Sequence, residues 1–210
     1  VGIIEEDPVK GLVKYAKPIG VIATLVPTTN PCLTPAGQIL YAIKARDVLV
    51  CSPHPRAKNV TNKCINIIRD VLVREGAPAD IIQGIEKPSI AVSQELMKRC
   101  DLVIATGGRP MVKSAYSSGT PAYGSGAGNA TVIIDNTCNT PERLAEAAEN
   151  TRISKTSDFG SGCSCDGNLV ISDAIYDDFV KALEAHGAYL ANAEEAEKIN
   201  TVGDAVEAIK

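Results

Sequence analysis

Histidine is scarce in this chain, and its cysteines are not arranged for metal binding or for disulfides. Only two histidines are present, His54 and His186, and each is isolated in the sequence. The seven cysteines are odd in number, and their spacings match neither a disulfide framework nor paired zinc-ligand dipeptides. Cys163 and Cys165 could ligate a metal together, but two further ligands would be missing. The sequence therefore argues against a metal site and favours a reducing compartment.

The chain also lacks a basic surface pattern and any long apolar run. Its net charge is −4, and no stripe of basic residues interleaved with aromatics is present, which argues against nucleic-acid binding. No apolar run reaches the roughly 18 residues that a membrane-spanning helix needs. No charged-then-apolar leader is visible at the N-terminus, so we expect a cytoplasmic location with no membrane partner. Any peptide that directs the protein to a microcompartment would lie outside this sequence.

What is present is the composition of a folded globular protein. The 210 residues are 45% hydrophobic and 22% charged, which is typical of a chain that buries a core. The length predicts one or two domains. Cys51, Cys64 and Cys100 lie among apolar neighbours, and we expect them to be small core residues.

Short apolar runs alternate with longer segments of helical periodicity along the whole chain. The predicted strands are 18–27, 47–51, 81–83, 102–105, 121–123, 131–134 and 169–172. The predicted helices are 33–46, 57–75, 89–99, a segment from the turn at 106–108 to about 116, 141–154, 174–185 and the tail 192–210. Strands that alternate with helices of this length form βαβ units, so the sequence predicts an α/β fold with a mostly parallel sheet.

Three polar turns, at 28–30, 52–56 and 106–108, each follow a predicted strand. Ligands on parallel sheets bind beyond the carboxyl ends of the strands, so these turns are expected at one edge. The side-chain amide of Asn30 could donate a hydrogen bond to a developing oxyanion. An asparagine at this place can equally stabilise its own turn, and the sequence leaves both interpretations open.

Two glycine-containing turns resemble phosphate-binding elements to different degrees. Gly107 and Gly108 open a helix, where backbone can approach a phosphate at the positive end of the helix dipole, although many helices begin this way. The segment 124–129 superficially resembles a dinucleotide fingerprint. It precedes a strand, whereas the fingerprint opens a helix after a strand, so we reject that interpretation.

The segment 155–168 carries the main candidate for covalent chemistry. Glycines at 160, 162 and 167 bracket Cys163 and Cys165, so backbone can come close to a bound molecule. A cysteine held there can attack a carbonyl as a nucleophile. The alternative is a glycine-rich turn with two ordinary thiols.

Six segments, in this order, resemble motifs of the aldehyde dehydrogenase superfamily, and specifically of its coenzyme-A-acylating branch. The segments are 18–31, 51–57, 105–108, 113–121, 126–129 and 155–163. The resemblance extends to about residue 200, and around the cysteines it is nearest to acylating sulfoacetaldehyde dehydrogenases. It implies a Rossmann-like cofactor domain over residues 1–133 and the first part of an α/β catalytic domain over 134–210. Family members are longer, so the rest of the catalytic domain and the oligomerisation strands would be missing.

The resemblance also implies roles for individual residues. Cys163 would be the nucleophile, with Cys165 as a neighbour, and Asn30 would hold the oxyanion together with the backbone N–H of Cys163. The residues expected to contact NAD or NADP are Thr28, Ser52, His54, Arg56, Thr106, Gly107, Gly108 and Gly126. Of these, Ser52, His54 and Arg56 would lie near the adenosine end of the cofactor. Thr106, Gly107 and Gly108 would lie near its pyrophosphate.

One departure from the hydrolytic members of the superfamily is informative. Those enzymes carry a glutamate general base just before the segment that matches 124–129, whereas no carboxylate lies between Pro121 and Ile134 here. Water is poorly activated without a base, while a thiol needs less help. The resemblance therefore implies oxidation of a short-chain aldehyde, with sulfoacetaldehyde as one candidate, and transfer of the acyl group to coenzyme A by a homo-oligomeric enzyme.

Two alternatives from other classes remain. One is a catalytically inactive fragment that binds a nucleotide or coenzyme A. The other is a small thiol-redox protein that uses Cys163 and Cys165, although their spacing is CxC rather than the CxxC of thioredoxin-like proteins.

Overall fold

The computed structural model describes residues 1–192 and divides the chain into two compact units, Val1–Ala127 and a second unit that begins at Gly128. The predicted domain boundary after residue 133 differs from this division. It would cut through β8 (Ala130–Ile134), which pairs in parallel with β9 (Asp166–Ile171), so that both strands belong to one unit.

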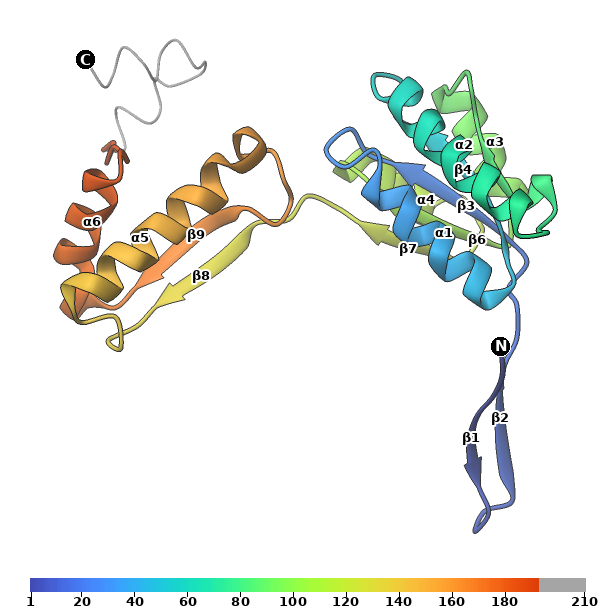
Figure 1. Cartoon of the computed structure of the whole chain (residues 1–210), viewed down its shortest axis with the longest axis horizontal. Coiled ribbons are helices and arrows are strands. Elements are labelled where there is room, and N and C mark those ends of the chain that lie inside the picture. The colour runs from blue at the N-terminus through green and yellow to red at the C-terminus, as the bar shows by residue number, and fades with distance from the viewer. Residues whose placement is uncertain (193–210) are drawn as a thin grey trace. The chain divides into compact units, whose positions relative to one another are not determined.

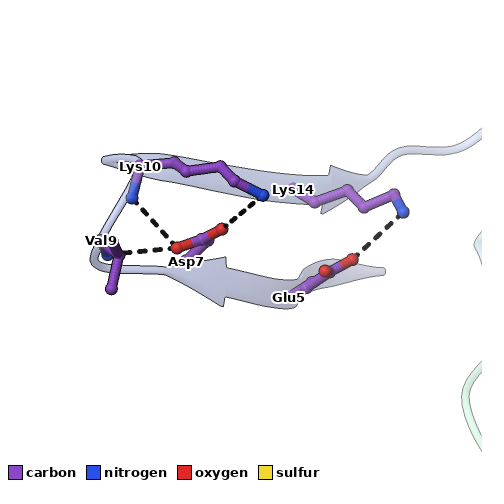
Figure 2. A network of polar contacts seen from close by, with 5 residues as sticks. All are labelled: Glu5, Asp7, Val9, Lys10 and Lys14. Carbon is purple, nitrogen blue, oxygen red and sulfur yellow. Dashed lines mark hydrogen bonds and ion pairs between the residues drawn. The ribbon is translucent and has the colours of Figure 1, made fainter.

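A β-hairpin that the sequence analysis does not predict occupies the N-terminus (Figure 1). Its strands, β1 (Gly2–Asp7) and β2 (Leu12–Ala16), are antiparallel. The turn is stabilised by Asp7, whose Oδ1 accepts hydrogen bonds from the backbone N–H groups of Val9 and Lys10 at 3.1 and 3.0 Å (Figure 2). An aspartate that bonds to its own turn in this way is a common turn former.

A five-stranded parallel sheet forms the centre of the first unit and confirms the predicted α/β fold. Its strand order is β5-β4-β3-β6-β7. The strands are β3 (Val21–Val26), β4 (Val48–Pro53), β5 (Ile82–Gly84), β6 (Leu102–Thr106) and β7 (Ala122–Ser125). After β3, the chain adds β4 and then β5 on one side of it. It then returns to add β6 on the other side of β3, followed by β7. Ligands on such sheets bind at this switch point, beyond the carboxyl ends of β3 and β6.

Helices cover both faces of this sheet, as expected for right-handed βαβ connections. They are α1 (Leu33–Ala45), α2 (Lys58–Arg74), the short η1 (Ala79–Ile81), α3 (Ile90–Arg99) and α4 (Arg109–Tyr116). Alternate residues of β3 supply two separate cores. Ile22 packs in one cluster with Ile39 of α1 and Ile65 of α2, whereas Leu25 packs in the other with Met97 of α3.

Two aspartates fix the amino end of β3. Asp47 is only 4% exposed, and its Oδ1 accepts hydrogen bonds from the N–H groups of Ile19 and Gly20 at 2.6 and 2.9 Å. Asp101 Oδ2 accepts one from Val21 N–H at 2.8 Å. Gly20 has a φ of 123°, and a Cβ added there would lie 2.3 Å from Asp101 Oδ2, so this junction requires glycine.

We expect Asp47→Ala to lower the free energy of unfolding by about 2–3 kcal/mol, because it leaves two backbone donors without their charged acceptor. Chemical denaturation followed by circular dichroism measures the change. Asp47→Asn keeps an acceptor oxygen and is the matched control, with a smaller loss. Equal stability of the alanine variant and the wild type would contradict a role for Asp47 in anchoring the sheet.

The second unit is a single βαβ element followed by a helix (Figure 1). Between β8 and β9 lie α5 (Pro141–Thr156) and the short η2 (Ser157–Gly160), and η3 (Asp173–Ile175) leads into α6 (Tyr176–Ala185). The buried core residues are Ile134, Leu144, Ala148, Ile175 and Phe179.

Most predicted elements are confirmed, but several boundaries differ, among them the start of β3 at Val21 rather than at residue 18. Gly124 and Ser125, expected in a loop, are strand residues of β7, and α5 extends to Thr156. β9 begins at Asp166 rather than at residue 169, because its backbone pairs with β8 from that point. The predicted helix over 192–210 lies outside the described residues, except for Asn192. Within the described part of the chain, no helix is long and apolar enough to cross a membrane.

Candidate active site

The three polar turns predicted to meet at one edge do so in the first unit, because β4, β3 and β6 are adjacent and parallel. Residues of the predicted site follow the carboxyl ends of four strands. They are Thr28 and Asn30 after β3, His54 and Arg56 after β4, Thr106 to Gly108 at the end of β6, and Gly126 after β7. The first unit thus collects all candidate cofactor residues on one edge, while Cys163 belongs to the second unit.

Asn30 is exposed, and its amide is oriented by the start of α1. Asn30 Oδ1 accepts a hydrogen bond from Leu33 N–H at 3.2 Å, so the asparagine does stabilise its own turn. This bond uses the oxygen of the amide and leaves the Nδ2 hydrogens as donors. The turn-stabilising and oxyanion-binding interpretations are therefore compatible, since they use different atoms of one side chain.

The three site candidates of the predicted turn at 52–56 divide into Ser52, which is buried within β4, and two accessible side chains that follow the strand. Ser52 is only 3% exposed, and its hydroxyl hydrogen-bonds that of Ser93 in α3 at 2.8 Å. This hydrogen bond links β4 to α3. His54 is half-buried and Arg56 is exposed, and Arg56 N–H donates to His54 Nδ1 at 3.2 Å. That bond places the imidazole hydrogen on Nε2.

Glycine is not required by the protein itself at the turn after β6. A Cβ at Gly107 would make only ordinary contacts at 3.6 Å, and one at Gly108 would lie 3.7 Å from Pro110. Gly126 likewise has open space where a side chain would be. Gly108 is the N-cap of α4, and no side chain caps that helix. These glycines leave the space beyond the sheet edge open, which is expected where a ligand approaches the backbone closely.

An open polar hollow of about 490 Å³ lies against α2 and was not foreseen from the sequence. Its lining residues are Asn59, Asn62, Lys63, Asn66, Ile67, Asp70 and Glu86. Asn62 Nδ2 donates to Ile85 O at 3.1 Å, while its buried Oδ1 has no hydrogen-bond partner. Asn59, Asn62 and Asn66 are spaced so that they share one face of a helix. The helical periodicity of the sequence could therefore have indicated this polar face.

Cys163 is exposed on a loop whose backbone takes an unusual path. Three consecutive residues, Asp158, Phe159 and Gly160, have left-handed φ angles of 49°, 55° and 66°. A Cβ at Gly160 would lie 2.8 Å from Lys155 O, so glycine is required there. Such a conformation persists in non-glycine residues only where the surroundings hold it.

Hydrogen bonds inside and at the base of this loop hold it. Cys165 Sγ donates to Gly160 O at 3.1 Å, which gives Cys165 a structural contact that the sequence did not reveal. At the base, Ser154 Oγ donates to Asp166 Oδ1 at 2.8 Å, and Asp166 N–H donates back to Ser154 Oγ at 3.1 Å.

The segment that leads into β8 packs directly against the nucleophile loop. A Cβ at Gly128 would lie 2.7 Å from Cys163 O, and a Cβ at Gly167 would lie 1.6 Å from Asn129 Oδ1. Both glycines are therefore needed for this contact. Gly128 belongs to a segment that resembled the family, but its role could not be predicted because it depends on a residue far along the chain.

Cys163 differs from the other thiols in its accessibility. All seven cysteines lie within residues 1–192, and Cys163 alone is exposed. Burial raises the pKa of Cys51 to about 12, and burial also raises the pKa values of Cys64 and Cys100. Thiols of this kind are poor nucleophiles. Within the described residues, no group of three or more metal-ligating side chains is present.

The chain belongs to the aldehyde dehydrogenase family, whose pattern matches residues 3–208. Within that family it falls in the coenzyme-A-acylating branch, as its relatives show. A sulfoacetaldehyde dehydrogenase from Acholeplasma sp. is 44% identical over 92% of this chain. An acylating sulfoacetaldehyde dehydrogenase from Bilophila wadsworthia is 41% identical over 95%, and an acetylating succinate-semialdehyde dehydrogenase from Clostridium kluyveri is 41% identical over 93%.

Solved structures agree with this assignment. An acetylating aldehyde dehydrogenase from Geobacillus thermoglucosidasius superposes with a TM-score of 0.85 at 39% identity and covers 97% of this chain. A Rhodopseudomonas palustris propionaldehyde dehydrogenase with bound propionyl-CoA has a TM-score of 0.74 at 31% identity and covers 88% of this chain. An engineered glycolyl-CoA reductase with bound NADP+ has a TM-score of 0.74 at 30% identity, again covering 88%.

The chain spans less than half the length of these relatives. It covers 39%, 42% and 42% of the three curated enzymes, and 45%, 41% and 42% of the three solved chains.

Proposed function

We propose that this chain carries the cofactor-binding edge and the nucleophile of a coenzyme-A-acylating aldehyde dehydrogenase. The observation that carries the proposal is Cys163, the one exposed thiol among seven, presented on a loop held by hydrogen bonds at its base and inside it. A thiol so placed is suited to form a thioester.

In the proposed reaction, the Cys163 thiolate attacks the carbonyl carbon of an aldehyde. The Nδ2 of Asn30 and the backbone N–H of Cys163 donate hydrogen bonds to the oxyanion that develops. NAD or NADP supplies the hydride acceptor, so that the acyl group is left as a thioester on Cys163. The thiolate of coenzyme A then attacks this thioester, and Cys163 leaves as the thiolate that began the cycle.

Acyl transfer to coenzyme A rather than to water is supported by the residues of the β7–β8 segment. No carboxylate lies between Pro121 and Ile134 to serve as a general base for water. The relatives in the acylating branch and the propionyl-CoA held by the propionaldehyde dehydrogenase are consistent with this choice.

For the dinucleotide, we assign the open edge of the first unit. Thr28, Thr106, Gly107, Gly108 and Gly126 would approach its phosphates and nicotinamide half, the glycines because nothing in the protein fills the space above them. Ser52, His54 and Arg56 would lie toward the adenosine, and the Ser52 hydroxyl is also hydrogen-bonded to Ser93 of α3.

For the aldehyde, we propose a short-chain substrate, with sulfoacetaldehyde as the first candidate because two of the relatives carry that name. Succinate semialdehyde is the competing candidate for the same reason.

Arg152 is not a free partner for the anionic end of either compound. Glu149 holds it through two hydrogen bonds, which with His186 lower the pKa of that carboxyl to about 2.

The test measures NADH formation by the protein at its natural length. Sulfoacetaldehyde, succinate semialdehyde and acetaldehyde are compared as substrates, each with and without coenzyme A. We expect turnover that requires coenzyme A, and the aldehyde with the highest kcat/KM identifies the substrate. Turnover that ignores coenzyme A would contradict the argument from the missing carboxylate.

A second candidate is a nucleotide- or coenzyme-A-binding module without activity, because the open space above Gly107, Gly108 and Gly126 would serve ligand binding with or without a reaction. Cofactor binding without turnover would support it. The homo-oligomeric state and the cytoplasmic or microcompartment location carry over from the family resemblance as parts of the main proposal.

A further inference from the structure

The loop that carries Cys163 is closed at its base by a reciprocal pair of hydrogen bonds. Ser154 lies near the end of α5, and Asp166 is the first residue of β9. The Ser154 hydroxyl donates to Asp166 Oδ1 at 2.8 Å and accepts from Asp166 N–H at 3.1 Å. Both residues are half-buried, so water competes less for these bonds than it would on an open surface.

The loop between Ser154 and Asp166 has a conformation that other contacts must hold in place. Asp158 and Phe159 have left-handed φ angles without being glycine, and Phe159 is fully exposed, so packing of its side chain does not hold the turn. Ser161 ties the turn locally by donating its hydroxyl to Asp158 O at 2.6 Å. The Cys165 thiol bonds to Gly160 O within the loop. Only the pair of Ser154 and Asp166 fixes the two ends to each other.

We propose that Ser154 and Asp166 are positioning residues for Cys163, a proposal that rests on the function assigned to Cys163 above. They act through the loop, by holding the thiol and the backbone N–H of Cys163 in the arrangement that attack on a carbonyl requires. Asp166 acts as a hydrogen-bond acceptor and not through its charge, since the Ser154 hydroxyl supplies the donor. A displacement of about 1 Å in such an arrangement costs on the order of 100-fold in rate.

The test compares two reactions of the Cys163 thiol that need neither cofactor nor aldehyde. Acylation by p-nitrophenyl acetate passes through an oxyanion and depends on the position of the Cys163 N–H. Alkylation by iodoacetamide is a direct displacement and depends only on the exposure and ionisation of the thiol. The ratio of the two rates at Cys163, located by peptide mass mapping, therefore reports position.

We expect Ser154→Ala and Asp166→Ala to lower this ratio by about tenfold or more, since the oxyanion donor is displaced. Asp166→Asn keeps an acceptor oxygen and should retain the wild-type ratio, as should Ser154→Thr, which keeps the hydroxyl. Circular dichroism confirms that each variant is folded, and the Asp166 variants suffice if Ser154→Ala does not fold.

An unchanged ratio in both alanine variants would overturn the proposal. A loss in Asp166→Asn as large as that in Asp166→Ala would overturn the claim that Asp166 acts as an acceptor. Failure of the proposed function would give a different experimental result. NADH formation would then not require coenzyme A, while the ratio would still respond to the alanine variants.

Discussion

Cys163→Ala is expected to abolish coenzyme-A-dependent NADH formation, lowering kcat/KM on the order of 10⁴-fold or more. The variant removes the only exposed thiol of the chain and with it the atom that would carry the acyl group. The loop should keep its conformation, because the hydrogen bonds that hold it involve Ser154, Asp166, Cys165 and Gly160 and not the Cys163 side chain. The loss should therefore be chemical rather than structural.

Cys165→Ser is the matched control for this experiment. Serine keeps a donor for Gly160 O, so we expect it to retain activity within about tenfold of wild type. If Cys165→Ser were as inactive as Cys163→Ala, the nucleophile would have to be reassigned or shared. Mass spectrometry of the protein trapped with substrate should find the acyl group on the peptide that contains Cys163.

Asn30→Asp is expected to lower kcat by about 100- to 1,000-fold, the usual loss when one oxyanion donor is removed. The substitution separates the two roles of Asn30. An aspartate oxygen can still accept the hydrogen bond from Leu33 N–H, so the start of α1 is preserved. The Nδ2 donor, however, is replaced by a negatively charged oxygen that repels the oxyanion.

Asn30→Ala completes the comparison because it removes both the acceptor and the donor. We expect it to be inactive and also less stable, by about 1 kcal/mol for the lost hydrogen bond from Leu33 N–H, as measured by chemical denaturation. An active Asn30→Asp variant would mean that Asn30 only stabilises its turn. Steady-state kinetics at several pH values would exclude protonation of the new carboxyl as the cause of any residual activity.

The central strands of the first unit, β3, β4 and β6, were predictable because they contain continuous apolar runs. Residues 21–26 are buried on both faces, and only a strand inside a parallel sheet requires that pattern. The N-terminal hairpin was not predictable, since a register shift between Ile3 and Glu5 interrupts its alternation. The early start of β9 was hidden for a different reason. Asp166, Gly167 and Asn168 are poor strand formers and join the sheet only through pairing with β8.

The candidate site shows the same limit at the level of side chains. Cys163 and Asn30 could be chosen from the sequence, because reactive residue types stand out in turns and in family motifs. The hydrogen bond between Ser52 and Ser93 could not be predicted, since Ser93 lies on α3, 41 residues further along the chain. The contact of Gly128 with Cys163 O joins residues far apart in the chain, and the pair of Ser154 and Asp166 depends on how the loop between them folds back, so a single sequence carries no signal for either.

The position of β3 in its sheet has a consequence for synthesis on the ribosome. β3 pairs on one side with β4, which follows closely, but on the other side with β6, which is made only after α2, β5 and α3. Until residue 106 has left the exit tunnel, the central strand has unpaired backbone N–H and C=O groups along one edge and apolar side chains beside them, a combination that favours aggregation. We therefore expect β3 to be most prone to aggregation in the interval between the synthesis of β4 and that of β6.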